Sequence, residues 1–366
     1  MFEKIKIKAE GRDITKYKFL GITIYKKEKL LSLRNYFILG FKFFYKQTKP
    51  DSVKTYLFGI RIIKKSINVV ENLLKYSQNH DFIYYCFHQG DFYYLCSNIE
   101  KNFEKFKHYK ILSYFPYNKR VLELFEIDQS WITENFVAVP YFYPSLALMC
   151  DKNGKILKHM CIDHRKGWQI DNQSQKIKSN YRNIAETISL FLNESFDIYN
   201  SPIKSLISVK RNYIYIFPDS RFNGKMSYDL LKNLIKRLSN CGFKIFINTA
   251  NKRYDDLLSN NVQKIFLPLK ETFIEVSRSY AVIGVRSGVI DCLQSLIHHD
   301  VKFFIIYNKI HYPHYKYFKQ YYKWVKEVYS FNLINNCNKF IEYFYPENLA
   351  QIENDIVDKL RLLKNS

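Results

Sequence analysis

One stretch, residues 280–296, constrains the fold of this chain more than any other, because it contains the clearest change from strand to helix. It reads Tyr-Ala-Val-Ile-Gly-Val-Arg-Ser-Gly-Val-Ile-Asp-Cys-Leu-Gln-Ser-Leu. Residues 281–285 form a short apolar run that is typical of a buried strand, and apolar residues then recur at helical spacing (Val289, Leu293, Leu296). The chain is therefore expected to turn from strand to helix at Arg286-Ser287-Gly288.

This turn has the chemistry of a phosphate-binding site. A helix N-terminus leaves backbone N–H groups unpaired and carries a partial positive charge. Gly288 lets a ligand approach the backbone, and Arg286 adds a planar fork of donors. We therefore expect Arg286, Ser287 and Gly288 to bind a phosphorylated ligand. The alternative is an ordinary turn of a parallel sheet, in which a carboxylate such as Asp291 pairs with Arg286.

Strands and helices alternate through most of the chain. The pattern predicts strands at 82–87, 109–115, 137–143, 147–150, 213–217, 244–248, 264–267 and 302–307, and helices at 67–76, 92–106, 119–125, 183–192, 228–238 and 271–278. It is interrupted at 200–208 by Ser201-Pro202 and scattered polar residues. We therefore expect an α/β fold with two Rossmann-like domains, 69–204 and 205–345, that face a central cleft, and a C-terminal helix within 346–366.

The first 68 residues carry a near-repeat. Its copies are Tyr17-Lys-Phe-Leu-Gly-Ile-Thr-Ile-Tyr-Lys-Lys, Tyr36-Phe-Ile-Leu-Gly-Phe-Lys-Phe-Phe-Tyr-Lys and Tyr56-Leu-Phe-Gly-Ile-Arg-Ile-Ile-Lys-Lys. An apolar run on both sides of a glycine is typical of a short hairpin or a bent strand. The segment is thus expected to be β-rich, as three packed hairpins, as a basic, aromatic surface that rests on anionic headgroups, or as both at once.

The net charge and the cysteine pattern limit the partners and the cellular compartment that can be expected for the protein. The 57 Lys and Arg residues exceed the 34 Asp and Glu residues by 23, which implies an anionic partner such as nucleic acid, a phosphorylated substrate or acidic lipid. The seven cysteines include no Cys-x-x-Cys pair, which favours reduced thiols in a cytoplasmic protein. No run approaches the roughly 20 apolar residues that span a bilayer, and the N-terminus lacks the apolar core of a signal peptide. Any membrane association is therefore expected to be peripheral.

Three pieces of the sequence resemble the GT-B glycosyltransferases, in particular the heptosyltransferase-like enzymes (similar to glycosyltransferase family 9) that build bacterial lipopolysaccharide. They are Gly90-Asp91 after the first strand of the α/β pattern, Phe217-Pro218-Asp219-Ser220 followed by Lys225, and the run 269–288 that ends in the Arg286 turn. The resemblance spans roughly residues 80–310, and it is strongest in the second half.

The resemblance implies a role for each piece. Asp91 would be the general base that takes a proton from the acceptor hydroxyl in an inverting transfer, with Gly90 beside it on the acceptor side. Lys225 would hold the donor diphosphate as a point charge, with Ser220 in the same loop. Arg286 stands in place of an acidic residue that helps to hold the donor in the family. An Arg there would stabilise the charge that develops on a diphosphate leaving group.

Several of these residues have a structural alternative. Asp91 could cap the N-terminus of a helix, and Lys225 could be a solvated loop lysine. His164, in Asp163-His164-Arg165-Lys166, is a further acceptor-side candidate, with a solvated turn as the alternative. No Asp-x-Asp motif stands in a suitable place, so we expect no metal and no cofactor.

The sequence thus predicts a bacterial glycosyltransferase that moves a sugar from a nucleotide-diphosphate sugar to a lipid-linked or cell-envelope glycan (lipopolysaccharide, lipooligosaccharide or capsule). It would act in the cytoplasm, at the inner face of the cytoplasmic membrane and against its anionic surface, with no nucleic-acid partner. Three alternatives remain open: a nucleic-acid-binding protein, a relative of the same fold without catalysis, and a transferase of a non-sugar group.

Overall fold

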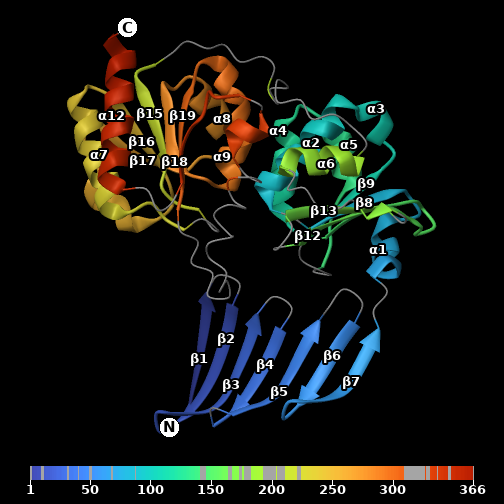
Figure 1. Ribbon diagram of the computed structural model, residues 1–366. Coiled ribbons are helices and arrows are strands. Elements are labelled where there is room, and N and C mark those ends of the chain that lie inside the picture. Colours follow the sequence, from blue (N-terminus) through green and yellow to red (C-terminus); the bar gives the residue numbers. More distant parts are fainter. Residues whose placement is uncertain are drawn as a thin grey trace.

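The computed structural model describes residues 2–9, 12–30, 33–39, 41–48, 52–66, 69–86, 88–140, 146–163, 167–172, 175–176, 183–192, 203, 211–220, 224–308, 326, 330–335, 337–344 and 348–365. Its strands form three sheets that follow one another along the chain (Figure 1). The predicted boundary at 200–208 lies outside the described residues, apart from Ile203.

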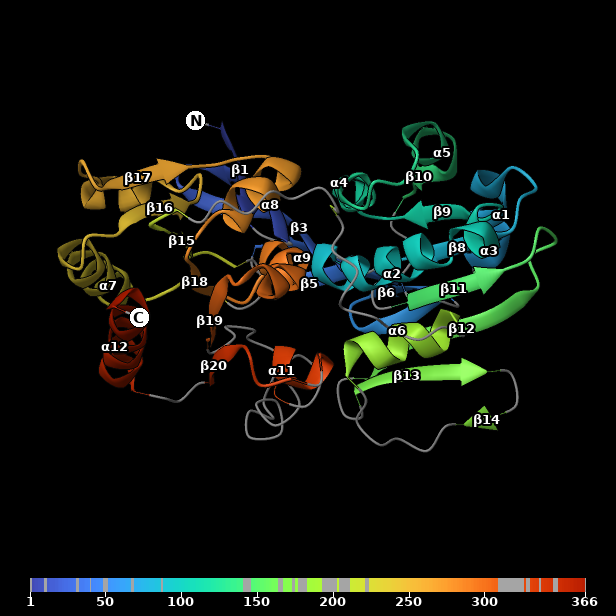
Figure 2. The same ribbon diagram turned by 90° about the horizontal axis from the view of Figure 1, so that it is seen from above.

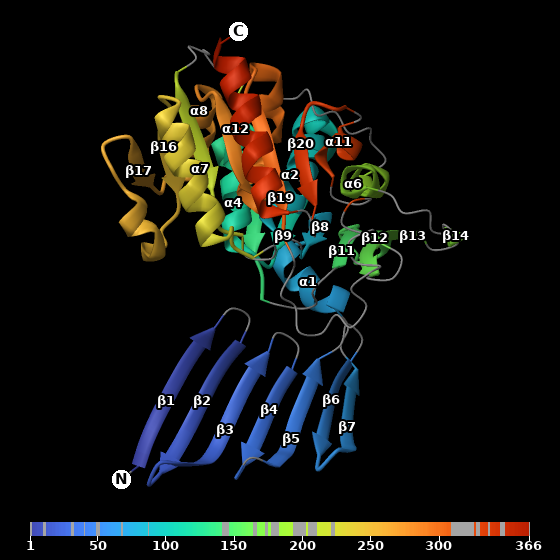
Figure 3. The ribbon, with the colours of Figure 1, turned by 60° about the vertical axis from the view of Figure 1, so that its left-hand side comes forward.

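The first sheet is an antiparallel meander in which every strand pairs with the next one along the chain. Its strands are β1 (Phe2–Ala9), β2 (Arg12–Phe19), β3 (Ile22–Leu30), β4 (Leu33–Ile38), β5 (Phe41–Thr48), β6 (Ser52–Leu57) and β7 (Ile60–Ser66). Figures 1 and 3 show this sheet apart from the helices, with the N-terminus at the end of the sheet farthest from them.

Each near-repeat of the sequence forms one hairpin of this meander. Leu20 and Gly21, between β2 and β3, have φ angles of 47° and 80°, and Phe58 and Gly59, between β6 and β7, have φ angles of 46° and 85°. Two successive positive φ angles are the geometry of a type I′ turn, which matches the twist of the strands that it joins. Leu39, between β4 and β5, also has a positive φ, of 45°.

The second sheet has the order β10-β9-β8-β11-β12-β13-β14. The strands β8 (Phe82–Tyr85), β9 (Lys110–Ser113) and β10 (Phe136–Ala138) are parallel, whereas β11 (Leu146–Cys150), β12 (Ile156–Asp163), β13 (Gly167–Asn172) and β14 (Gln175–Lys176) are antiparallel to their neighbours. The helices of this first α/β part are α1 (Val69–Ser77), α2 (Gln89–Lys101), α3 (Phe103–Phe106), η1 (Pro116–Asn118), α4 (Lys119–Leu124), α5 (Gln129–Asn135) and α6 (Ile184–Leu192).

The expectation of a Rossmann-like sheet for this part is therefore wrong for four of its seven described strands. The connection between β11 and β12 is a tight turn around Asp151, whose Oδ1 accepts hydrogen bonds from the backbone N–H groups of Asn153 and Lys155, both at 2.9 Å. A turn this short joins antiparallel strands, because parallel neighbours need a crossover of a dozen or more residues.

The third sheet is wholly parallel, with the order β17-β16-β15-β18-β19-β20. Its strands are β15 (Tyr213–Phe217), β16 (Lys244–Asn248), β17 (Val262–Ile265), β18 (Ala281–Val285), β19 (Lys302–Tyr307) and β20 (Ile341–Phe344). Numbered within the sheet, this order is 3-2-1-4-5-6, the order of a doubly wound Rossmann sheet. The strand order reverses between β15 and β18.

Helices cover both faces of the third sheet (Figure 2). The helices of this second α/β part are α7 (Tyr228–Asn240), η2 (Lys252–Leu257), α8 (Leu269–Ser277), α9 (Gly288–Leu293), η3 (Gln294–His299), α11 (Phe331–Ile334) and α12 (Leu349–Asn365). The apolar sides of α7 and α12 share one buried cluster with the sheet, and those of α8 and α9 belong to another.

The cluster under α9 continues into the first α/β part. Phe92 and Leu95 of α2 belong to the same buried cluster as Ile290 and Leu293 of α9, and all four side chains are fully buried. Figure 2 shows α2 beside α9. The two α/β parts therefore meet through a continuous apolar contact between these helices.

Candidate functional site

The reversal of strand order marks the place where an open α/β sheet binds its ligands. At this point the connections from two adjacent strands lead away to opposite faces of the sheet, which leaves a crevice outside their carboxyl ends. Here the adjacent strands are β15, which ends at Phe217, and β18, which ends at Val285. Two of the predicted motifs, Pro218-Asp219-Ser220 and Arg286-Ser287-Gly288, follow these ends directly. The topology therefore brings them together at the switch point.

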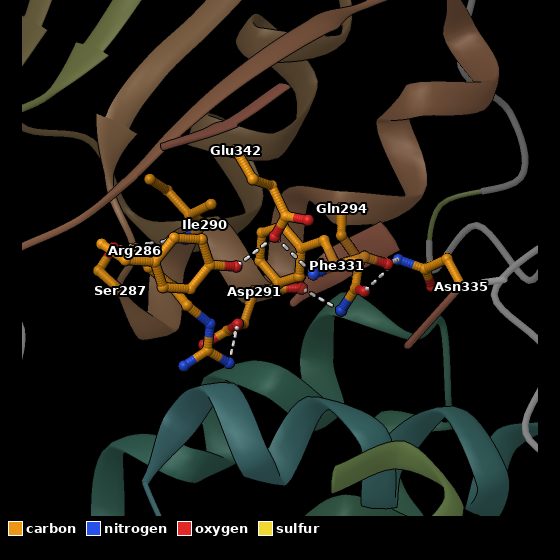
Figure 4. Close-up of polar contacts among 9 residues, drawn as sticks. Arg286, Ser287, Ile290, Asp291, Gln294, Phe331, Asn335 and Glu342 are labelled. Atoms are coloured by element: carbon orange, nitrogen blue, oxygen red, sulfur yellow. Dashed lines mark hydrogen bonds and ion pairs between the residues drawn. The ribbon is translucent and has the colours of Figure 1, made fainter. Parts of the chain in front are cut away.

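Arg286 is held by an ion pair inside the protein. Its Nη2 donates to Oδ1 of Asp291 at 2.6 Å, and the two residues are only 7% and 3% exposed. The guanidinium also lies over the ring of Phe331, 5.5 Å from its centroid, and Figure 4 shows the pair at the edge that faces the helices of the first α/β part. The structural alternative for Arg286 is thus realised, since Asp291 supplies its counter-charge.

The amide side chains of Gln294 and Asn335 hold the backbone of Asp291 in place. Nε2 of Gln294 donates to the backbone oxygen of Asp291 at 2.7 Å, and Nδ2 of Asn335 donates to Oε1 of Gln294 at 3.3 Å (Figure 4). Ser287 begins the helix, with its Oγ accepting from the backbone N–H of Ile290 at 3.5 Å. The turn is therefore rigid before any ligand arrives.

Gly288 does not leave the open approach that the sequence predicts. A Cβ atom at Gly288 would lie 3.0 Å from the backbone nitrogen of Gly90 and 3.2 Å from Cβ of Gln89. A Cβ atom on Gly90 would overlap Oδ2 of Asp291. The first turn of α2 thus occupies the space beside the Cα atom of Gly288, and the binding of a ligand at Gly288 stays a prediction. Glycines on both helices permit this close approach.

The two helix N-termini would repel each other without counter-charges. Each N-terminus carries a partial positive charge. Asp91 lies in the first turn of α2 and Asp291 in the first turn of α9, so each helix brings a carboxylate to the contact. Gly90, Asp91, Arg286 and Asp291 thus form one polar cluster at the switch point, although the two pairs are about 200 residues apart in the sequence.

Asp91 is not the N-cap of α2. That position belongs to His88, and Asp91 is the third residue of the helix. The hydroxyl of Tyr85 donates to the backbone oxygen of Asp91 at 2.9 Å, which ties this turn to the end of β8. The alternative that the sequence left open for Asp91 therefore does not hold.

The carboxyl of Asp91 has the acid–base properties that proton abstraction requires. Burial raises its pKa to about 7, with Arg286 opposing the rise and Asp291 adding to it. Burial likewise raises the pKa of Asp291 to about 6, against the effect of Arg286. Asp91 is partly exposed as a whole residue, while its carboxyl group is desolvated enough to raise the pKa. A carboxylate with a pKa near neutrality is a suitable general base.

The loop after β15 lies across the carboxyl end of the sheet. The backbone N–H of Ser220 donates to the oxygen of Gly224 at 2.8 Å, and Nδ2 of Asn308, after β19, donates to the backbone oxygen of Lys225 at 2.8 Å. Because β18 lies between β15 and β19, this bond carries the loop over the end of β18. Ser220 is partly exposed, and the side chain of Lys225 is exposed to solvent.

Sequence reasoning missed a polar group beside this loop. The carboxylate of Asp219 accepts from Oγ1 of Thr249 at 2.6 Å and from the hydroxyl of Tyr254 at 3.0 Å. Asp219 and Thr249 follow the parallel strands β15 and β16. Their positions after apolar runs are the sequence signal from which this polar group could have been predicted. An ionised carboxylate has about four acceptor sites, so Asp219 retains capacity for the hydroxyl groups of a ligand.

A second titratable side chain lies one helical turn from Asp91. Nδ1 of His88 and the hydroxyl of Tyr117 share a hydrogen bond of 3.0 Å, and the His88 ring lies 4.3 Å from that of Phe115. His88 and Asp91 are three residues apart at the start of α2, a spacing that places both on one helix face. His164, the other acceptor-side candidate, lies outside the described residues.

The described part of the chain has neither a metal-binding cluster nor a helix that could span a membrane. Its His, Cys, Asp and Glu side chains include no group of three or more that could hold a metal ion. None of its helices is both long enough and apolar enough to cross a membrane. The strand order defines a doubly wound α/β sheet, and the polar cluster lies at its switch point.

No protein-family model matches the chain, and no curated protein matches it. Among solved structures, the chain is similar to heptosyltransferase WaaC of E. coli with ADP-2-deoxy-2-fluoro heptose (TM-score 0.45, 10% identity, 78% of this chain and 99% of that one). It is also similar to the iron-containing dodecameric glycosyltransferase TibC of enterotoxigenic E. coli (TM-score 0.38, 11% identity, 78% and 69%). A third is the pneumococcal O-GlcNAc transferase GtfA in complex with UDP and GlcNAc (TM-score 0.28, 10% identity, 99% and 74%).

These structures are of the group that the sequence motifs resemble. All three TM-scores are below 0.5, so the likeness adds no weight to any single residue. The function of this chain has to be inferred from its own side chains and topology.

Proposed function

We propose that this protein is a GT-B type glycosyltransferase that moves a sugar from a nucleotide-diphosphate sugar to a cell-envelope glycan. Residues 69–204 would carry the acceptor side and residues 205–345 the donor side. One observation carries the proposal: a carboxylate with a pKa of about 7 from one α/β part lies at the switch point of a Rossmann-ordered sheet in the other. That arrangement supports the proposal, because Asp91 would then be a general base beside a nucleotide site.

The donor would bind at the carboxyl ends of β15 and β18. The exposed ammonium of Lys225 would hold the diphosphate, and Ser220 would line the same loop. Asp219, already oriented by Thr249 and Tyr254, would accept hydrogen bonds from sugar hydroxyls. Arg286, Ser287 and Gly288 would face the leaving group only in part, because Asp291 and the first turn of α2 share this space.

Transfer would proceed in one displacement with inversion. The acceptor oxygen attacks the anomeric carbon, the bond from that carbon to the diphosphate oxygen breaks, and Asp91 takes the proton of the acceptor hydroxyl. Gly90 keeps the turn narrow enough for Asp91 to lie beside Arg286. We propose a metal-independent reaction, because the side chains named above supply both the positive charge and the base.

The acceptor and its location follow from the charge of the whole chain. The net charge of +23 suits an anionic surface, and we propose a peripheral position at the inner face of the cytoplasmic membrane, with a lipid-linked or envelope glycan as the acceptor.

A thermal-shift panel tests the donor site. UDP, GDP, ADP and CMP, each with and without common sugar conjugates, are added to the wild type, to Lys225→Ala and to Lys232→Ala, an exposed lysine of α7 that serves as the control. A ligand at about 100 times its Kd stabilises the fold by about 2.7 kcal/mol, which corresponds to several degrees. One nucleotide diphosphate should shift the wild type and the control, and it should shift Lys225→Ala much less.

Two results, from the same thermal-shift assay with added oligonucleotides and from a transfer assay, would overturn the proposal. A shift with oligonucleotides and none with any nucleotide would make the protein a nucleic-acid binder. A clear nucleotide shift without transfer to any glycan or lipid acceptor would make it a relative without catalysis.

A further inference from the structure

The meander exposes apolar side chains that a free-standing sheet would normally hide. Of the nineteen large apolar side chains that are exposed in the described part of the chain, thirteen lie between Phe2 and Ile63. Nine of them belong to the three turns of the near-repeats: Phe19 (43%), Leu20 (71%), Ile22 (66%), Ile38 (46%), Leu39 (60%), Phe41 (79%), Leu57 (37%), Phe58 (73%) and Ile60 (71%). These nine residues are the apolar tips of the meander.

The backbone at these tips disfavours the residues that occupy them. Leu20, Leu39 and Phe58 have positive φ angles of 47°, 45° and 46°. Asn, Asp and Gly are the usual residues at the first central position of a type I′ turn, because a bulky side chain is strained there. The meander carries Leu or Phe at this position three times, and each side chain is at least 60% exposed. Backbone strain that recurs at three equivalent turns, each with an exposed apolar side chain, points to a function.

The topology gathers the three tips at one end. Strands of an antiparallel meander alternate in direction, so the turns after β2, β4 and β6 lie at the same end of the sheet. Phe2, 74% exposed, joins them because it pairs with Phe19. Figures 1 and 3 show that this end points away from both α/β parts. The tips therefore form a row that a flat surface can contact all at once.

Basic side chains lie next to each tip. Lys18 precedes the first tip, Lys42 follows the second and Arg61 follows the third. Residues 1–66 contain 17 Lys and Arg residues against 5 Asp and Glu residues, a net charge of +12, which is about half of the +23 of the whole chain. A second copy of such a sheet would be repelled, whereas an anionic lipid surface would be attracted.

We propose that the apolar tips insert into the interfacial region of an anionic lipid bilayer, while Lys18, Lys42 and Arg61 contact the lipid headgroups. The insertion is shallow, because most of the exposed apolar side chains of the meander lie at the turns and the strands behind them carry many charged side chains. The meander then stands on the membrane and holds the α/β parts away from it. This inference does not rest on the transferase proposal, so lipid binding and donor binding can fail separately.

Matched variants test the insertion by vesicle co-sedimentation. The double variant Leu20→Asn/Phe58→Asn removes two tips and places a favoured residue in each turn, so it should fold at least as well as the wild type. The double variant Phe266→Asn/Leu362→Asn is the control, since these side chains have nearly the same exposures, 72% and 71%, in the second α/β part. The full-length wild type, the tip variant and the control are mixed with vesicles of phosphatidylcholine, with and without phosphatidylglycerol.

The wild type and the control should bind the phosphatidylglycerol vesicles equally. The tip variant should bind them at least about 100-fold more weakly, because burying one Leu or Phe side chain changes an equilibrium by roughly tenfold or more. The triple variant Lys18→Gln/Lys42→Gln/Arg61→Gln should lose about fivefold per residue on anionic vesicles only. Nucleotide shifts should be the same in all four proteins.

Three results would overturn the inference. The first is a wild type that stays in the supernatant with anionic vesicles, and the second is equal binding of these vesicles by the tip and control variants. The third is a dimer in analytical ultracentrifugation that the tip variant alone abolishes, with no vesicle binding by the wild type. The tips would then be an interface between two copies of the chain.

Discussion

At the scale of single residues, the raised pKa of Asp91 lowers the free energy of unfolding of the protein at neutral pH. Burial raises its pKa to about 7, and that of Asp291 to about 6, from an ordinary value of about 4. The folded chain thus keeps these two protons at a pH where the unfolded chain has lost them. Their contribution to stability is complete below pH about 4, and it is lost as the pH rises through 6 and 7.

Asp91→Asn should therefore stabilise the fold above neutrality while removing the base. At pH 8 we expect a free energy of unfolding larger than that of the wild type by on the order of 2 kcal/mol, and therefore a higher Tm, with a difference that shrinks toward pH 4. Transfer should fall by about 100-fold or more. Calorimetry across this pH range and a transfer assay measure the two effects.

Asp128→Ala is the control with the opposite sign. Ser130 and the backbone N–H of Trp131 hydrogen-bond to Asp128 and lower its pKa, so its contribution is lost as the pH falls and the variant should be less stable at pH 8. A destabilised Asp91→Asn protein at pH 8 would show that Asp91 is a structural carboxylate.

At the scale of elements, the contact between α2 and α9 determines the geometry of the site. Each helix has a glycine at the point of closest approach, where Gly90 faces the carboxylate of Asp291 and Gly288 faces the backbone nitrogen of Gly90. The cluster of Asp91, Arg286 and Asp291 exists because these glycines let two helix N-termini approach each other. Packing at this point therefore affects both stability and chemistry.

Gly90→Ala should be costly although alanine favours helices. The new Cβ would overlap the carboxylate that pairs with Arg286, so we expect a loss of about 1–3 kcal/mol, which thermal denaturation measures. Gly288→Ala, whose Cβ would have neighbours at 3.0 and 3.2 Å, should cost less. A gain of about 1 kcal/mol for Gly90→Ala, as at an exposed helix position, would mean that α2 and α9 separate easily.

At the scale of the whole molecule, the meander and the α/β parts have different physical characters. The three buried apolar clusters of the described structure contain residues from position 73 onward and none from the meander. The α/β parts therefore have complete cores of their own, and the meander contributes charge and exposed apolar tips.

Removal of residues 1–68 should abolish vesicle binding and leave the folding and nucleotide binding of the α/β parts unchanged. The shortened chain should unfold cooperatively, as followed by circular dichroism, and should show the same nucleotide shift as the full-length protein. It should no longer sediment with phosphatidylglycerol vesicles. Retention of vesicle binding at physiological salt would place the lipid contact on the α/β parts, and loss of cooperative unfolding would mean that the meander completes their core.

The sequence by itself determined the elements whose signals are local. The strands at 213–217, 244–248, 281–285 and 302–307 have the predicted bounds, because an apolar run between polar residues records burial directly. The near-repeats likewise determined the hairpins through their glycines. For the site, the sequence identified the turns after β8, β15 and β18 as places where polar residues meet a strand end.

Only the tertiary structure decided which of these residues meet. The pairing of Arg286 with Asp291, the contact of Gly90 with α9, the carboxylate of Asp219 between Thr249 and Tyr254, and the antiparallel β11 to β14 all depend on partners that local periodicity does not encode. The raised pKa of Asp91 has the same origin, since burial against a helix about 200 residues away is a property of packing. The strand and helix periods of the sequence indicate which side chains each segment buries. Only the assembled chain determines which other segments these side chains pack against.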